Sequence, residues 1–176
     1  MKKLLSLLLL AAASLGTFLA LGGCCRAADD DCVDGGVRRR SNCNAPKVIH
    51  SDEIAALETD FFLYDEDGNG GSGWFFSVLP EGDSFTLSAK RSGKQAAEKP
   101  VDRAFLNEVH AVILKHGLAR LNGFDEVTSG LPYEYSPCSL SVDYASGERL
   151  YFQMNGRPVA EWPQALLEIF LESVGH

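Results

Sequence analysis

Five short stretches of this chain have the residue pattern of β-strands, and they constrain its fold more than any other feature. Residues 84–90 (SFTLSAK) and 138–144 (CSLSVDY) alternate apolar with polar side chains, the period of a strand with one buried and one solvated face. Residues 148–154 (ERLYFQM) repeat this alternation. Residues 59–64 (TDFFLY) and 73–79 (GWFFSVL) are rich in the aromatic residues that strands favour. A sheet built from these strands needs a layer that covers one of its faces.

Two stretches have the period of an α-helix instead. In residues 101–116, apolar side chains recur three or four positions apart, with Asp102 as a candidate N-cap and Gly117 as a candidate C-terminal stop. A second apolar stripe follows Trp162 and Pro163, and proline is tolerated in the first turn of a helix. The expected order is βββ-α-ββ-α. We therefore predict an α+β domain in which two helices cover one face of an antiparallel sheet of about five strands.

The N-terminus has the order of a secretory signal. Lys2 and Lys3 precede an apolar run over residues 4–21. The run ends at Leu21-Gly22-Gly23-Cys24, which resembles the lipobox of bacterial lipoproteins. The resemblance implies cleavage after residue 23, a lipid on the sulfur of Cys24, and a location on the extracytoplasmic face of the cell membrane. The alternatives are an ordinary signal with a chance cysteine, or an uncleaved anchor helix.

The charge of the chain limits its partners. Removal of residues 1–23 deletes two lysines, so the net charge changes from −8 to −10. An acidic surface repels nucleic acid and anionic lipids, so the lipid on Cys24 would be the contact with the membrane. Residues 24–47 show no hydrophobic periodicity, and we expect a flexible tether there before a single domain at residues 48–176. The basic residues within 90–103 are interpreted as a solvated turn.

Four further cysteines are Cys25, Cys32, Cys43 and Cys138. Their spacing matches no zinc-binding pattern, and disulfides persist outside the cytoplasm. Four cysteines allow three pairings, among which the sequence does not choose. Free thiols remain the alternative.

The C-terminal part of the chain carries a second resemblance. The segments GLARLNGF, SGLP and SLSVDYASGERLYFQMNGRP resemble a group of small secreted lipoproteins from gut anaerobic bacteria. The likeness spans roughly residues 51–174 and is a pattern of strands and turns. It includes no known catalytic residue, so it implies the architecture and the envelope location alone.

Residues 65–74 (DEDGNGGSGW) begin like the calcium loop of an EF-hand. Asp65, Asp67 and Asn69 place side-chain oxygens at alternate positions before a glycine. The last position of that loop is Phe76 instead of a glutamate, and the flanking residues resemble strands and not helices. Asp-Gly and Asn-Gly are also common hairpin turns. We favour a structural turn, with weak calcium binding by these three side chains as the alternative and no other cofactor expected.

The sequence contains no motif of a catalytic nucleophile. The long connection at residues 117–137 contains Tyr133 and Tyr135, and long loops on a rigid scaffold often have a binding role. We take these two tyrosines as a candidate binding surface. We therefore expect a binding module for a protein, a peptide or a glycan of the cell envelope rather than an enzyme. The alternatives are an envelope hydrolase that uses carboxylates, and a weak calcium-binding domain.

Overall fold

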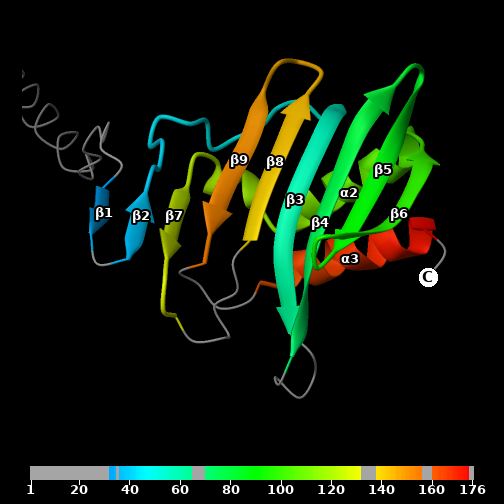
Figure 1. The fold of residues 1–176 in the computed structure, drawn as a ribbon. Coiled ribbons are helices and arrows are strands. Elements are labelled where there is room, and N and C mark those ends of the chain that lie inside the picture. Colours follow the sequence, from blue (N-terminus) through cyan, green and yellow to red (C-terminus); the bar gives the residue numbers. More distant parts are fainter. Residues whose placement is uncertain (1–31, 35, 65–69, 132–137, 156–159, 175–176) are drawn as a thin grey trace, which may run out of the picture.

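The computed structural model describes most of the chain from residue 32 to residue 174. The described residues are 32–34, 36–64, 70–131, 138–155 and 160–174. In this part of the chain, nine strands form one sheet in the order β1-β2-β7-β9-β8-β3-β4-β5-β6. Two α-helices lie together on one face of the sheet (Figure 1). The α+β class and the placement of the helices are confirmed, while the sheet is larger than the expected five strands.

The bounds of the elements follow the chain from the N-terminus. The strands are β1 (Cys32–Asp34), β2 (Val37–Arg39), β3 (Ile54–Tyr64), β4 (Gly71–Glu81), β5 (Ser84–Arg91), β6 (Lys94–Val101), β7 (Asp125–Thr128), β8 (Cys138–Tyr144) and β9 (Arg149–Met154). The helices are α2 (Arg103–Lys115) and α3 (Glu161–Val174), with a short 3-10 helix, η1 (Leu118–Leu121), after α2. All strand pairs are antiparallel except β7 with β9, which is parallel. The sheet is therefore mixed, and the prediction of an antiparallel sheet is wrong at this pair.

The expected strands form because their apolar residues meet the helices. In β8, the side chains of Leu140 and Val142 are buried, whereas those of Ser139 and Asp143 on the other face are half-buried or exposed. The predicted caps of α2 are also present. The side chain of Asp102 accepts a hydrogen bond from the backbone N–H of Phe105 at 3.1 Å, and Gly117 has a positive φ of 61° after the helix.

Aromatic side chains join α3 to the sheet. The ring of Phe170 on α3 lies 4.2 Å, between centroids, from the ring of Phe76 on β4. Trp162, at the start of α3, meets Phe61 of β3 edge-on at 6.1 Å and Phe152 of β9 edge-on at 5.6 Å. All of these residues are buried. One helix thus contacts strands that are far apart in the sequence, and this packing fixes the helix on one face of the sheet.

The folded body begins before residue 48. Strand β2 pairs with β7, and the side chain of Arg39 forms an ion pair with Glu126 at 2.8 Å. Beyond β2, the backbone N–H of Arg40 donates to the carbonyl of Asp125 at 2.8 Å, and that of Asn42 to the carbonyl of Gly123 at 2.7 Å. Residues 37–47 are therefore part of the domain and not of the expected tether. Hydrogen bonds and ion pairs hold them, and such contacts leave no hydrophobic periodicity in the sequence.

Strand β6 ends the sheet on the side opposite β1. The sequence indicated a solvated turn in this region, but the turn is confined to Ser92 and Gly93, with φ values of 50° and 77°. Residues 94–101 continue as a strand that pairs with β5. Its side chains are mostly exposed, and it contains three charged residues and Pro100. Charges and proline on an edge strand oppose pairing with further strands.

Candidate functional site

A pocket of about 640 Å³ lies at one end of the sheet. Its walls come from three parts of the chain. The first is residues 40–53, which connect β2 to β3 and are called the strap below; the second is the turn between η1 and β7 with the start of β7; and the third is the turn between β8 and β9 with the first half of β9. We call it the strap pocket. Its lining residues are Arg40, Asn42, Asn44, Ala45, Pro46, Ile49, Asn122, Gly123, Asp125, Gly147, Glu148, Arg149 and Tyr151.

Asn122 holds the strap against β9. Its side chain is buried, and its Nδ2 donates to the carbonyl oxygens of Pro46 and Arg149, each at 2.9 Å. Its Oδ1 accepts the backbone N–H of Tyr151 at 2.8 Å. The next residue, Gly123, has a positive φ of 76° and lies so close to Asn42 and to the side chain of Ala45 that a Cβ atom would clash. The Asn-Gly pair thus lets the strap approach the sheet.

Glu148 holds the other end of the strap. Its carboxylate accepts the backbone N–H groups of His50 at 3.0 Å and Ser51 at 2.8 Å, and the hydroxyl of Ser146 at 3.1 Å. The hydrogen bond from His50 is the largest cause of a lowered pKa of Glu148, and the bonds from Ser51 and Ser146 add to it against a smaller effect of desolvation. A general acid of a hydrolase needs a raised pKa, so the environment of Glu148 favours a structural role.

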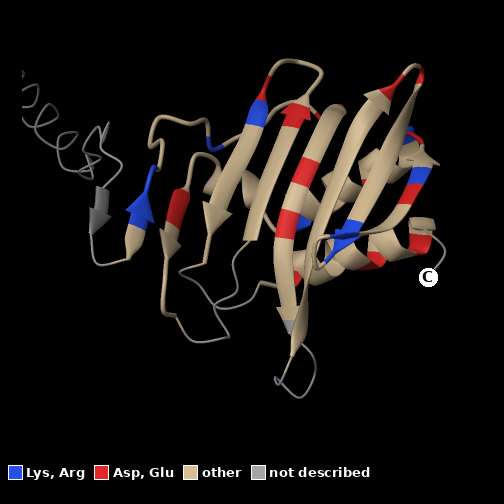
Figure 2. Cartoon of the chain, viewed as in Figure 1, with Lys and Arg blue, Asp and Glu red and all other residues tan. Residues whose placement is uncertain are grey.

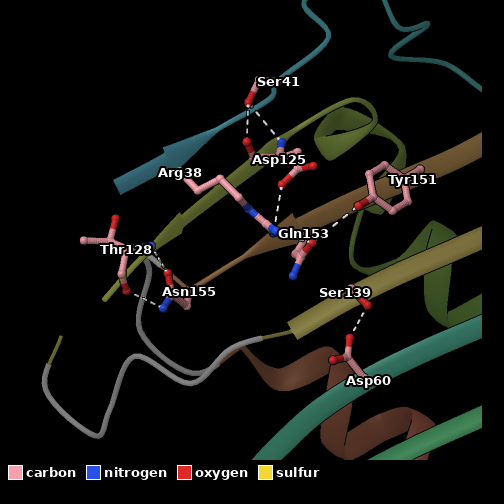
Figure 3. A network of polar contacts seen from close by, with 9 residues as sticks. All are labelled: Arg38, Ser41, Asp60, Asp125, Thr128, Ser139, Tyr151, Gln153 and Asn155. Atoms are coloured by element: carbon pink, nitrogen blue, oxygen red, sulfur yellow. Dashed lines mark hydrogen bonds and ion pairs between the residues drawn. The ribbon is translucent and has the colours of Figure 1, made fainter. Parts of the chain in front are cut away.

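A polar network lies beside the pocket on β2, β7 and β9 (Figure 3). Arg38 of β2 donates from Nη2 to Oε1 of Gln153 at 2.9 Å, and the same nitrogen lies 3.6 Å from Oδ1 of Asp125. The hydroxyl of Ser41 accepts the backbone N–H of Asp125 at 3.0 Å and donates to its carbonyl at 3.3 Å. The hydroxyl of Tyr151 donates to Gln153 at 3.4 Å. Because β7 lies between β2 and β9, the guanidinium of Arg38 spans one strand of the sheet.

Asp125 is a buried carboxylate beside the strap pocket. The residue is 8% exposed and lines the strap pocket. Its Oδ1 is inaccessible to solvent and lies 3.6 Å from Nη2 of Arg38, and a side-chain hydrogen bond with Asp125 is one of the smaller causes that raise the pKa of Tyr151. Burial, and then the charge of Asp125, raises the pKa of Tyr151, so this phenol is neutral at ordinary pH. The pocket therefore combines a buried carboxylate oxygen with a neutral hydroxyl group.

The face of the sheet opposite the helices is polar and continues away from the pocket. Tyr151, Ser141, Glu58 and Ser77 stand opposite one another on β9, β8, β3 and β4. Figure 2 marks the acidic positions of β3 in the middle of the sheet. Glu58 is exposed and has neither a hydrogen bond nor an ion pair to the described side chains. Its neighbour Asp60 accepts the hydroxyl of Ser139. One face of an antiparallel sheet is commonly solvated in this way, so we place the candidate site at the pocket.

The candidate site residues singled out from the sequence fall outside the described residues. Strands β3 and β4 form a hairpin with Tyr64 opposite Gly71, which confirms that strands flank the proposed calcium loop. These candidates are Cys24, Asp65, Asp67, Asn69, Tyr133 and Tyr135. Within the long connection at 117–137, the chain instead forms η1 and β7.

Two of the cysteines are placed. Cys43, in the strap, is disulfide-bonded, whereas Cys138 on β8 is a free and buried thiol. Burial, followed by the charge of Asp60, raises the pKa of the Cys138 thiol to about 12. A disulfide that includes Cys138 is thereby excluded, and the pairing of Cys43 with Cys25 or Cys32 stays open.

The pocket itself was not predicted. Its polar residues, among them Asn42, Asn122 and Glu148, come together only through contacts across long stretches of sequence. The one local signal was the turn dipeptide Asn122-Gly123, which the sequence analysis treated only as part of a long connection.

Neither a metal site nor a membrane span is present in the described ranges. Across these ranges, three or more His, Cys, Asp or Glu side chains do not gather where they could hold a metal ion. Of the helices described, none is long and apolar enough to cross a membrane. Comparison with known proteins gave no match to a family model, to a curated protein or to a solved structure.

Proposed function

We propose that this chain is a lipid-anchored binding module of the bacterial cell envelope, which takes a protein, peptide or glycan ligand in the strap pocket. The observation on which this proposal rests is the pocket itself. Its volume of about 640 Å³ falls within the range of roughly 300–1,000 Å³ that is usual for sites that bind small molecules or single groups of larger ones. Hydrogen bonds that Asn122 donates and that Glu148 accepts fix its walls, so that a ligand would meet a preformed surface.

The N-terminal sequence supports the location. The resemblance of Leu21-Gly22-Gly23-Cys24 to a lipobox favours a lipid on Cys24 and a position outside the cytoplasm. Strand β1 of the sheet begins at Cys32, so the domain would lie close to the bilayer surface. In this arrangement, the pocket would meet components of the envelope and not of the cytoplasm.

Replacement of Asn44 by tryptophan tests the pocket. The side chain of Asn44 lines the pocket and is exposed, and the contact that Asn44 makes with Asn42 comes from its backbone N–H, which tryptophan keeps. An indole at this position would fill the pocket without disturbing the fold. The matched control is Val48→Trp, in the same strap, because Val48 is 59% exposed and does not line the pocket.

The measurement is capture of envelope components by the full-length chain. The chain would be crosslinked in membranes of the source cells, purified, and the attached material identified. We expect Asn44→Trp to lose the crosslinked component and Val48→Trp to keep it. Equal capture by both variants, or no capture by the unaltered chain, would contradict the proposal.

Replacement of Cys24 by serine tests the anchor. A serine oxygen cannot replace the thiol that receives the lipid, so the precursor is expected to accumulate unprocessed and without lipid. Metabolic labelling with a radioactive fatty acid, followed by mass measurement of the protein, reports both effects. Normal labelling and cleavage in the Cys24→Ser chain would refute lipidation at this residue.

A further inference from the structure

The charges that line the strap pocket balance one another. Arg40 and Arg149 oppose Asp125 and Glu148, so the lining has no net charge. Most of these groups are also already engaged: Arg149 forms an ion pair with Asp143 at 3.3 Å, and Glu148 accepts backbone N–H groups of the strap. A site for an anion or a cation needs an excess of the opposite charge. The lining therefore selects for a neutral ligand.

The uncharged lining groups include both donors and acceptors of hydrogen bonds. The side-chain amide of Asn44 can both donate and accept, Nδ2 of Asn42 can donate, and the hydroxyl of Tyr151, which donates to Gln153, can accept. A ligand whose groups each donate and accept would satisfy this mixture best. Hydroxyl groups have this property.

The pocket also has an apolar side. The side chains of Pro46 and Ile49 in the strap line it together with Tyr151, which is half-buried. A sugar ring presents C–H groups on its faces and hydroxyl groups around its rim, so such a ring suits a pocket with one apolar wall and several polar ones.

A peptide strand fits the surroundings less well. Peptides commonly bind by adding a strand to a free edge of a sheet. At the pocket, one edge of β9 pairs with β8, and on the other edge the backbone groups of Arg149 and Tyr151 bond to Asn122 and Gly123. The backbone groups that a peptide strand would use there are occupied.

From these observations we infer that the strap pocket binds a neutral, hydroxyl-rich sugar unit of a glycan. This inference rests on the proposed function and names the ligand class of the same pocket. The amides of Asn42 and Asn44 would bind hydroxyl groups of the sugar, and the ring of Tyr151 would pack against the sugar.

The test is titration of the full-length chain, held in a zwitterionic detergent, with defined sugars. The neutral probes are glucose, galactose, mannose, N-acetylglucosamine, maltose, cellobiose, lactose and chitobiose; the charged probes are glucosamine and galacturonate. Calorimetry and saturation-transfer NMR would report binding. We expect at least one neutral probe to bind with a Kd below about 10 mM, and its charged counterpart to bind at least about ten times more weakly.

Variants place the binding in the pocket. Asp125→Asn removes the charge that pairs with Arg38 beside Tyr151 of the pocket, and we expect it to weaken sugar binding by about tenfold or more. Asp60→Asn is the matched control, because Asp60 also contacts a serine hydroxyl of the sheet but does not line the pocket. Asn44→Trp, whose site is exposed, supplies a second variant that does not depend on the buried network. Thermal melts would show that the chains compared are folded.

The outcomes separate the ligand class from the proposed function. Absence of binding by all neutral probes at about 10 mM, or tighter binding of a charged probe, would overturn the sugar assignment. Binding that neither Asp125→Asn nor Asn44→Trp weakens would also overturn it. If the unaltered chain still captured an envelope component and Asn44→Trp did not, the proposed function would stand with another ligand class. If the unaltered chain captured no component, both the proposed function and the sugar assignment would be refuted.

Discussion

The carboxylate of Glu148, in the turn between β8 and β9, accepts the backbone N–H of Ser51 at 2.8 Å across a separation of 97 residues. The hydrogen bond from the backbone N–H of His50, and to a smaller extent this one from Ser51, lower the pKa of Glu148 from its usual 4.5. The carboxylate therefore stabilises the fold in its ionised form. Its hydrogen bonds connect the strap to the turn between β8 and β9 at the edge of the pocket.

The lowered pKa of Glu148 predicts that the stability of the fold decreases at acidic pH. Because its pKa is lower in the folded than in the unfolded chain, its contribution is complete above pH about 4.5 and is lost as the pH falls through the folded value. Between pH about 5 and about 3, the unaltered chain should lose more stability than Glu148→Gln. Urea unfolding at each pH measures this difference. Parallel curves for the two chains would show that the carboxylate has no such role.

The hydrogen bonds of Asn122 predict a large loss of stability when its side chain is shortened. Asn122→Ala leaves the carbonyls of Pro46 and Arg149 and the N–H of Tyr151 without their partner. Since an unsatisfied buried group costs about 1–3 kcal/mol, we expect a loss of about 2–4 kcal/mol. Chemical denaturation would measure it. Asn44→Ala, at an exposed position, is the control and should change the stability by less than about 0.5 kcal/mol. A small loss for Asn122→Ala would mean that water replaces these contacts.

His110 predicts a second, separate effect of pH. It is 9% exposed on α2, its ring meets that of Tyr144 edge-on at 5.9 Å, and its Nδ1 is buried with no hydrogen bond to the described residues. Burial lowers the pKa of His110, and the charge of Asp52 opposes this in part. Stability should therefore fall as the pH decreases from about 7 to about 5.5, and less so in His110→Phe. Thermal melts at both pH values test this, with His50→Gln as the exposed control.

The burial of Cys138 predicts that its thiol is protected from alkylation in the folded chain. With a pKa of about 12, roughly one thiol in ten thousand is ionised at pH about 8, and the side chain is buried. Iodoacetamide should leave the peptide that contains Cys138 unmodified in the native chain and modify it in urea. Mass spectrometry of the digested protein would show both states. Rapid alkylation without urea would mean that β8 opens readily.

Local residue patterns predicted the elements that bury apolar side chains. The alternation in β5, β8 and β9 and the stripe in α2 reflect contact with one core, so each could be identified without its partners. The caps Asp102 and Gly117 act within one turn of the helix, and they too are visible locally.

Other strands have no such pattern. Strand β6 is exposed on most positions, and β2 is held by the ion pairs of Arg38 and Arg39. Strand β7 has four residues and pairs in parallel with β9, which comes later in the chain. Their pairing depends on distant partners and not on their own periodicity. The strap pocket lies between such segments, so it could not be predicted from the sequence for the same reason.

The central place of β3 has a consequence for how the chain reaches its fold. The strands β3 to β6 are neighbours in sequence, but the other edge of β3 pairs with β8, as in the bond from the hydroxyl of Thr59 to the carbonyl of Ser139, 80 residues away. Closure of such long loops is slow, so β3 to β6 should assemble first. One edge of β3 should then stay unpaired until β8 joins the sheet. Pulsed hydrogen exchange during refolding should then protect the amides of β4 and β5 before those of β9. During that interval the growing molecule would depend on fast synthesis of its last third, or on a chaperone, to keep that open edge from meeting a second chain.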